Sequence, residues 1–153
     1  MEGNVIQLGR KVKDFKLKDH NNALFQLSAC QGKKVLLSFH PLAWTAVCAQ
    51  QMKALEAQYK TLEKLNVAAV GVSVDSVPCK AAWARELKIK HTPLLADFWP
   101  HGGLAKALGI FREEGFSERA NILVNEEGRA AFIKIYPIKE LPDFGEILSH
   151  LQR

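Results

Sequence analysis

The stretch Lys34-Val-Leu-Leu-Ser-Phe-His40-Pro41-Leu-Ala-Trp-Thr-Ala-Val-Cys48 decides the fold, because it places a cysteine where a strand passes into a helix. Residues 34–40 form the short apolar run of a buried strand, and beyond Cys48 apolar residues recur every three or four positions up to Leu65. Unpaired N–H groups and the positive end of the helix dipole favour a negatively charged sulfur at a helix start. The location therefore suits a nucleophile, although the alternative at this point is a small, buried thiol without reactivity, as free cysteines usually are.

Strand and helix patterns alternate on both sides of this stretch. Residues 14–19 and 23–27 alternate apolar with polar positions around the turn Asp19-His-Asn-Asn22, which predicts an N-terminal β-hairpin. A βαβα series follows, which implies a parallel core with right-handed crossovers. Its predicted elements are a strand near 34–40, a helix near 45–64, a strand near 67–74 and a helix near 78–88.

The last third of the chain predicts smaller and mixed elements. They are a short strand at 94–96, a short helix at 101–108, strands at 119–124 and 130–136 around Asn-Glu-Glu-Gly, and a closing amphipathic helix at 140–151. We expect an α/β fold in which a central mixed sheet lies between helices. No repeat or Gly/Ser-rich linker interrupts the sequence, so residues 1–153 are predicted to form a single domain.

Length and cysteine content restrict the class of protein. A chain of 153 residues buries roughly 70% of the surface that its unfolded form exposes, so it needs no disulfides to fold. Three cysteines without a C-x-x-C pair or a histidine cluster argue against a disulfide framework and against a metal site. The first residues lack the pattern of a secretion signal, and no apolar run is long enough to span a membrane. We expect a cytoplasmic protein with reduced thiols.

The net charge of +5 raises the question of a nucleic-acid partner. The basic residues are scattered among apolar core positions, and no basic stripe is interleaved with aromatic residues. We interpret them as a solvated surface and expect neither a nucleic-acid nor a membrane partner.

The pattern Pro41-x-x-x-Thr45-x-x-Cys48 resembles the active-site signature of the peroxiredoxins, which are redoxins of the AhpC/TSA type. Further similarity lies in residues 71–75, 101–109, 117–119 and 122–128, so that it extends over nearly the whole chain. The single-domain branches named after the bacterioferritin comigratory protein and AhpE are the most similar. This resemblance implies a thioredoxin-like fold and a thiol-dependent peroxidase that reduces hydrogen peroxide and small organic hydroperoxides through a cysteine sulfenic acid, without a metal or other cofactor.

The resemblance assigns catalytic roles to four residues. Cys48 attacks a peroxide oxygen, and Thr45, three residues earlier, binds the peroxide and the sulfur through its hydroxyl; its alternative role is to cap the helix. Pro41, which lacks an N–H, shields the sulfur, unless it is an ordinary loop proline. Arg119 aligns with the arginine that stabilises the thiolate and the transition state.

Other polar residues near these positions leave alternatives open. Arg112 and Arg129 are neighbours that compete with Arg119 for the arginine role. Gln51 replaces a glutamate that is frequent in the family, so the polar network differs from the family pattern even though an amide can still bridge by hydrogen bonds. His40 is interpreted as a packed residue and not as a base, and Trp44 as part of the wall or of an interface.

Cys79 decides between two subclasses of peroxidase. It lies at the start of the second crossover helix, at the sheet end where sites form in α/β folds. Cys79 is therefore a candidate resolving cysteine that attacks the Cys48 sulfenic acid, within one chain or between chains, and a thioredoxin-like reductant then opens the disulfide. The alternative is a thiol without this role, with Cys48 resolved by an outside thiol. Cys30, in a polar turn, is the weaker candidate.

Two rival functions use the same cysteine. One is a thiol–disulfide oxidoreductase, which the missing C-x-x-C disfavours, and the other is a non-enzymatic redox sensor or holdase. The resemblance also implies self-association as a homodimer or a monomer–dimer equilibrium. Residues 77–78 with Trp44 and Trp83 are the expected dimer face, although the same side chains could pack inside one chain.

Overall fold

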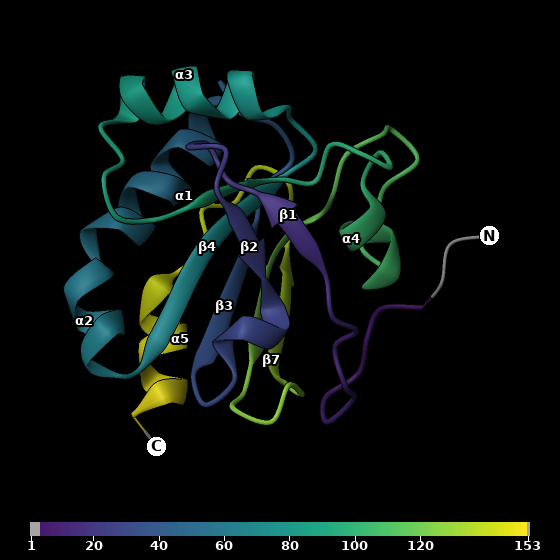
Figure 1. Ribbon diagram of the computed structural model, residues 1–153, viewed down its shortest axis with the longest axis vertical. Helices are drawn as coiled ribbons and strands as arrows, with labels where there is room; N and C mark the ends of the chain where they lie inside the picture. Colours follow the sequence, from purple (N-terminus) through teal and green to yellow (C-terminus); the bar gives the residue numbers. More distant parts are fainter. Residues whose placement is uncertain (1–3, 153) are drawn as a thin grey trace.

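A five-stranded mixed sheet forms the centre of the protein in a computed structural model that describes residues 4–152 (Figure 1). Residues 1–3 and 153, the ends of the predicted domain, lie outside the described residues. The strands are β1 (Lys16–Lys18), β2 (Leu24–Gln26), β3 (Lys34–Phe39), β4 (Val67–Ser73), β5 (Leu94–Ala96), β6 (Arg119–Val124) and β7 (Ala130–Tyr136). The helices are η1 (Leu27–Cys30, 3₁₀), α1 (Ala46–Ala57), α2 (Tyr59–Lys64), α3 (Val77–Leu87), α4 (Gly103–Ala107) and α5 (Phe144–Leu151).

Strand β3 lies in the middle of the sheet, whose order is β5-β4-β3-β6-β7. It pairs in parallel with β4 and antiparallel with β6, and five of its six residues are buried. A strand that is covered on both faces needs the continuous apolar run that residues 34–39 supply. The separate antiparallel pair of β1 and β2 is the predicted N-terminal hairpin. The predicted α/β fold, with a mixed sheet between helices, is confirmed.

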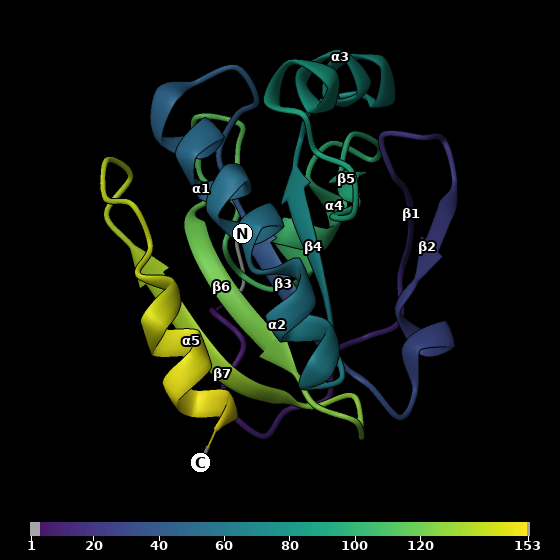
Figure 2. The ribbon, with the colours of Figure 1, turned by 90° about the vertical axis from the view of Figure 1, so that its left-hand side faces the viewer.

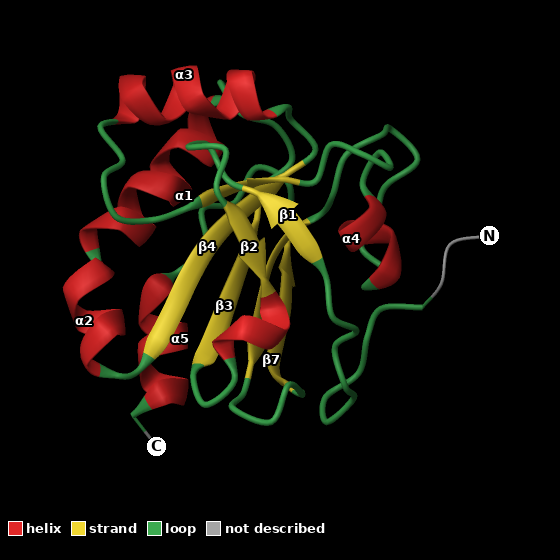
Figure 3. Ribbon diagram, in the orientation of Figure 1, coloured by secondary structure: helices red, strands yellow, loops and turns green. Residues whose placement is uncertain are grey.

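The side chains of β3 alternate between two cores, one on each face of the sheet. Leu36 packs in the core of α1, α2, α3 and α5, whereas Val35 and Leu37 pack in the core beneath α4 and the N-terminal segment. Figures 2 and 3 show α1, α2 and α5 on one side of the sheet and α4 away from them. The helices that follow β3 and β4 both begin at the same edge of the sheet, as the parallel pairing of these strands requires.

The predicted helix over residues 45–64 is wrong in one respect, because the structure divides it at Gln58. The Gln58 N–H bonds to the Leu55 carbonyl, and the residue has φ −95° and ψ 9°, so the chain leaves α-helical geometry there before α2 begins at Tyr59. The closing helix begins at Phe144 instead of 140. Asp143 caps it by accepting a hydrogen bond from the Gly145 N–H at 2.9 Å.

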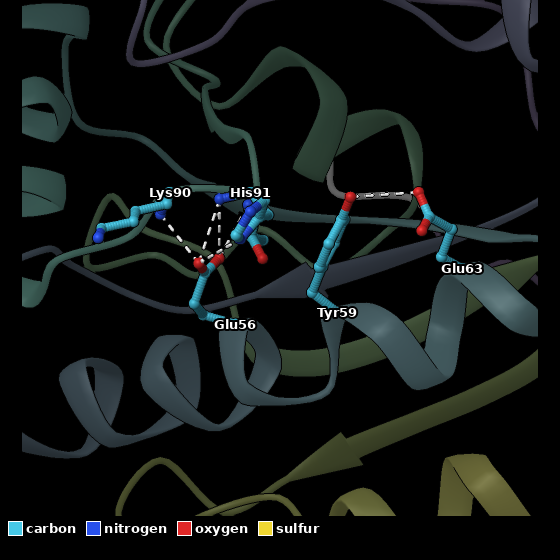
Figure 4. Close-up of polar contacts among 6 residues, drawn as sticks. Glu56, Tyr59, Glu63, Lys90 and His91 are labelled. Atoms are coloured by element: carbon cyan, nitrogen blue, oxygen red, sulfur yellow. Dashed lines mark hydrogen bonds and ion pairs between the residues drawn. The ribbon is translucent and has the colours of Figure 1, made fainter.

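The end of α1 also fixes the loop between α3 and β5. The Glu56 carboxylate accepts hydrogen bonds from the backbone N–H groups of Lys90, His91 and Thr92, at 2.9–3.1 Å, and lies 3.1 Å from His91 Nδ1 (Figure 4). Tyr59 stacks on the His91 ring with 4.1 Å between ring centroids. One carboxylate thus joins two elements that are more than thirty residues apart in the sequence.

Within residues 4–152, we find no helix that combines the length and the apolar character needed to cross a membrane.

Candidate active site

Cys48 lies in the first turn of α1, as the sequence predicts, and its side chain is completely buried. It is the third helical residue after Thr45, the N-cap. The apolar strand β3 ends at Phe39, and the buried Pro41 begins the short link to the helix. This link delivers the sulfur to the core that α1 shares with the sheet, in the first turn of the helix.

Arg119 reaches Cys48 from the first position of β6. Its Nη1 donates to Cys48 Sγ at 3.3 Å and to Gln51 Oε1 at 2.8 Å, and its Nε donates to the Ile138 carbonyl at 2.8 Å. The guanidinium is 3% exposed, so water screens its charge little. A buried cation with one nitrogen on the sulfur can stabilise negative charge that develops there during a reaction.

Gln51 connects this arginine to the central strand. Its Nε2 donates to Ser38 Oγ at 2.8 Å and to the Phe39 carbonyl at 3.1 Å, while its Oε1 accepts from Arg119. The side chain is buried one helical turn after Cys48. The amide therefore orients Arg119 by hydrogen bonds and needs no ion pair.

The other two candidate arginines lie elsewhere. Arg112 pairs with Glu114 and Glu118 at 2.8 and 3.0 Å, and Arg129 Nη1 donates to the Gly9 carbonyl. The structure thus places Arg119, and neither of its neighbours, beside the sulfur.

The Thr45 side chain does not cap α1, although Thr45 occupies the N-cap position. Its Oγ1 donates to the Leu42 carbonyl at 2.7 Å, and the residue is exposed at the outer end of the site. The capping alternative for this hydroxyl is therefore wrong. Trp44, next to it, has φ +70° and is 54% exposed, so it forms part of the rim.

Cys79 occupies the corresponding position of α3, three residues after the N-cap Ser76. Its N–H donates to Ser76 Oγ at 3.3 Å, and its thiol donates to Asp75 Oδ1 at 3.8 Å. Burial and then the Asp75 charge raise the pKa of the Cys79 thiol. Cys79 packs against the same core as Cys48, and both thiols are free.

Cys30 lies on the other face of the sheet. It ends the helical turn η1, packs against the core beneath α4, and donates through Sγ to the Gln26 carbonyl at 3.7 Å. The structure therefore brings Cys79, and not Cys30, to the Cys48 side of the sheet.

Two residues of the site region were not identified from the sequence as part of a network. Lys80 is completely buried, with Nζ 3.0 Å from His40 Nε2 and donating to Ser73 Oγ, and burial lowers the pKa of Lys80 to about 7. Burial and Lys80 hold the pKa of His40 well below its usual value, consistent with a packed residue and not a base. The spacing of Lys80 from the buried Trp83 and Ala84 is the helical signal that could have placed it inside.

The buried position of Trp83 corrects the predicted dimer face. Its side chain is 1% exposed and packs on His40 with 5.3 Å between ring centroids, so it belongs to the core of one chain.

Comparison with known proteins identifies the family. The model of the AhpC/TSA family matches residues 8–133. The chain belongs to the AhpC/TSA family. Alkyl hydroperoxide reductase E of Mycobacterium tuberculosis is 34% identical over 141 residues, which cover 91% of this chain and 92% of that protein. Peroxiredoxin-1 of Gekko japonicus is 32% identical over 146 residues, covering 88% of this chain and 72% of the relative.

Solved structures of AhpC/TSA proteins have the same fold. The reduced 2-Cys peroxiredoxin of Plasmodium vivax superposes with a TM-score of 0.86 at 26% identity, over 95% of this chain and 80% of that one. For AhpC of Enterococcus faecalis the TM-score is 0.87 at 26% identity, over 98% of this chain and 92% of that one. The predicted thioredoxin-like fold, the AhpE-like relationship and the assignment as a peroxiredoxin, a thiol-dependent peroxidase, are confirmed.

Proposed function

We propose that this peroxiredoxin reduces hydrogen peroxide and small organic hydroperoxides with Cys48 as the attacking residue. The observation that carries the proposal is the 3.3 Å contact between Arg119 Nη1 and Cys48 Sγ in a buried site at a helix start. The name of the mycobacterial relative, an alkyl hydroperoxide reductase, supports organic hydroperoxides as substrates.

In the first step, the Cys48 thiolate attacks one oxygen of the hydroperoxide. A sulfur–oxygen bond forms while the oxygen–oxygen bond breaks, and the second oxygen leaves as water or an alcohol after taking up a proton. Cys48 is oxidised to a sulfenic acid and the peroxide is reduced. Arg119 stabilises the charge that spreads over the sulfur and both oxygens.

Thr45 and Pro41 complete the proposed site. In this role the Thr45 hydroxyl turns from the Leu42 carbonyl to the incoming peroxide, which its exposed position allows. Pro41 is buried and, in this role, shields the sulfur without presenting a backbone N–H. Gln51 holds Arg119 in place.

Cys79 resolves the sulfenic acid in the second step. Its location in the first turn of α3, against the core that holds Cys48, supports this role, as does the likeness to a protein titled a 2-Cys peroxiredoxin. A thioredoxin-like or other thiol reductant then regenerates both thiols by disulfide exchange. We place the protein in a reducing compartment, the cytoplasm, where its three free cysteines would stay reduced.

Self-association as a homodimer, or as a monomer–dimer equilibrium, is the assembly we propose. The exposed Trp44 and Pro78 at the starts of α1 and α3 are its candidate contacts. Sedimentation of Trp44→Ala against the wild type tests this, because loss of the contact would shift the equilibrium toward monomer.

Mass spectrometry of the reduced protein after one equivalent of hydrogen peroxide tests the two steps. The wild type should contain a Cys48–Cys79 disulfide, and Cys79→Ser should stop at the Cys48 sulfenic acid. Cys30→Ser is the matched control and should behave as the wild type. Sulfenic acid in the wild type as well would show a one-cysteine enzyme, and an unmodified Cys48 would refute the peroxidase site.

Arg119→Ala should slow the reaction of Cys48 with peroxide by roughly 100-fold or more, by analogy with the loss of one electrostatic donor from an active site. The rate at which Cys48 is alkylated at pH 7, followed by peptide mass spectrometry, should fall as well. Arg129→Ala removes an exposed arginine that contacts the Gly9 carbonyl and should leave both quantities unchanged. Equal rates for the wild type and Arg119→Ala would refute the arginine assignment.

A further inference from the structure

Cys48 and Cys79 occupy the same position in two different helices. Each is the third helical residue after its N-cap, which is Thr45 in α1 and Ser76 in α3. The N–H groups and the dipole of a helix start favour a negatively charged sulfur at both positions. The helices alone therefore do not decide which thiol reacts first.

The side chains that face the two sulfurs carry opposite charges. Arg119 Nη1 donates to Cys48 Sγ at 3.3 Å, whereas the Cys79 thiol donates to Asp75 Oδ1 at 3.8 Å. A guanidinium favours a thiolate, while a carboxylate accepts a hydrogen bond from the S–H group and repels the negative charge that loss of the proton would create. Burial and Asp75 both act in this direction on the pKa of Cys79, which is raised.

The Asp75 carboxylate is held by the chain on both sides of the site. Its Oδ2 accepts from the Ala43 N–H at 2.8 Å and from Ser73 Oγ at 2.6 Å, which leaves Oδ1 directed at Cys79. One oxygen thus joins the link before α1 to the end of β4, and the other contacts the thiol at the start of α3. Asp75 Oδ1 is therefore a fixed acceptor for the Cys79 thiol, because the carboxylate is held through its other oxygen.

Besides Asp75, a second charged group that acts on the pKa of Cys79 is Lys80. Lys80, on α3, opposes Asp75 and lowers the pKa of Cys79, but burial and Asp75 outweigh it. Its buried amine contacts His40 and Ser73. The charges of Cys48 on α1 and of Asp97 after β5 act to raise the pKa of Lys80, against the larger effect of burial. Trp44, from the link before α1, also lowers the pKa of Cys79, by more than Lys80 does, yet burial and Asp75 outweigh both.

We propose that Asp75 is a positioning residue that keeps Cys79 protonated and docked while Cys48 reacts with peroxide. The inference rests on the proposed resolving role of Cys79. Once Cys48 is a sulfenic acid, Cys79 leaves Asp75 and its sulfur attacks the Cys48 sulfur. The new sulfur–sulfur bond forms, the sulfur–oxygen bond breaks, and the oxygen departs as water with the proton from Cys79. Asp75 therefore sets the order of the two thiols and protects Cys79 from direct oxidation.

Asp75→Asn tests this with little change of shape. The amide oxygen can still accept from Ala43 and Ser73, but the NH₂ group replaces the acceptor at Cys79 with a donor. In a Cys48→Ser background, peptide-resolved alkylation of Cys79 at pH 7 should become about tenfold faster, which corresponds to a shift of one pKa unit. Glu86→Gln, which removes an exposed carboxylate from the same helix, should have no effect.

Rapid-quench mass spectrometry of the variant with Cys48 intact completes the test. Disulfide formation after one equivalent of peroxide should be faster at pH 6–7 than in the wild type, with its pH profile moved to lower pH. An unchanged alkylation rate would overturn the role of Asp75. Equal slowing of sulfenic acid and disulfide formation would show a merely structural role and would overturn it too.

The alkylation assay needs no peroxide, so failure of the role of Asp75 can be distinguished from failure of the proposed function. If alkylation accelerates but the wild type forms no Cys48–Cys79 disulfide, Cys79 is not the resolving thiol. That outcome would overturn both the second step of the proposed function and the ordering role of Asp75.

Discussion

At the scale of single residues, one guanidinium nitrogen links the nucleophile to the polar core. Arg119 Nη1 donates to both Cys48 and Gln51, and Gln51 donates to Ser38 and Phe39 through its other end. An amide suits this place because it accepts on one side and donates on the other. A glutamate would set a second acceptor against the Phe39 carbonyl, which gives a physical reason for the departure from the family pattern.

Gln51→Leu should therefore damage both stability and activity. The substitution removes the Gln51 hydrogen bonds to Ser38, Phe39 and Arg119 in a buried place, so the free energy of unfolding should fall by about 1–3 kcal/mol. The peroxide reaction should slow because Arg119 is no longer held. Urea unfolding and stopped-flow kinetics measure these changes. Gln50→Leu, an exposed neighbour on α1, should stay within about 0.5 kcal/mol of the wild type; equal effects at both positions would contradict the network.

At the scale of elements, the ends of helices carry the connections that position the site. The start of α1 holds Cys48, and its end holds Glu56, which fixes the loop that leads from α3 into β5 (Figure 4). Local periodicity predicts the apolar face of this helix well, but it does not show the break at Gln58. After the break α2 packs on β4, a contact between elements that the local pattern does not include.

Glu56→Ala should loosen the loop before β5 without unfolding the sheet. Burial alone would raise the pKa of Glu56, but the hydrogen bonds from Lys90, His91 and Thr92 outweigh it and lower the pKa. The carboxylate thus stabilises the fold fully at neutral pH, and this contribution is lost as the pH falls through the lowered pKa.

The expected loss of stability at pH 7 for Glu56→Ala is about 1–3 kcal/mol, with faster hydrogen exchange at residues 90–92. At a pH below the lowered pKa of Glu56, the variant and the wild type should differ less in their free energy of unfolding. Glu63→Ala, which removes an exposed carboxylate contacting Tyr59, is the control and should change neither quantity. Unaltered exchange at residues 90–92 in Glu56→Ala would refute the role of this carboxylate.

At the scale of the whole molecule, the fold buries a lysine close to the site. Lys80 is completely enclosed between α3, β4 and His40, and burial lowers its pKa to about 7 from the ordinary value near 10.5. Between these two values the unfolded chain binds a proton that the folded protein does not. The free energy of unfolding must then rise with pH over this window, because proton binding favours the unfolded state less as the pH increases.

Lys80 should thus add a slope of up to about 1.4 kcal/mol per pH unit to the stability curve between about pH 7 and pH 10. Lys80→Met, which keeps the length of the side chain without the amine, should flatten the curve in this range. Urea unfolding at several pH values measures the slope. Lys53→Met, at an exposed position of α1, should retain it. A slope that survives in Lys80→Met would show that other groups produce it.

The sequence by itself determined the order of the main elements, the hairpin, the placement of Cys48 at a helix start and the family. These features rest on local periodicity, turn residues and a short motif, all of which act over a few neighbouring positions. Only the tertiary structure decided that Arg119 and not Arg112 or Arg129 faces the sulfur, and that Cys79 donates to Asp75. It also decided that Lys80 is buried. The Arg119 contact and the burial of Lys80 depend on side chains from separate elements that meet, while the Cys79 contact depends on how Asp75 is oriented by Ala43 and Ser73. The pattern along the chain does not encode which atoms will meet.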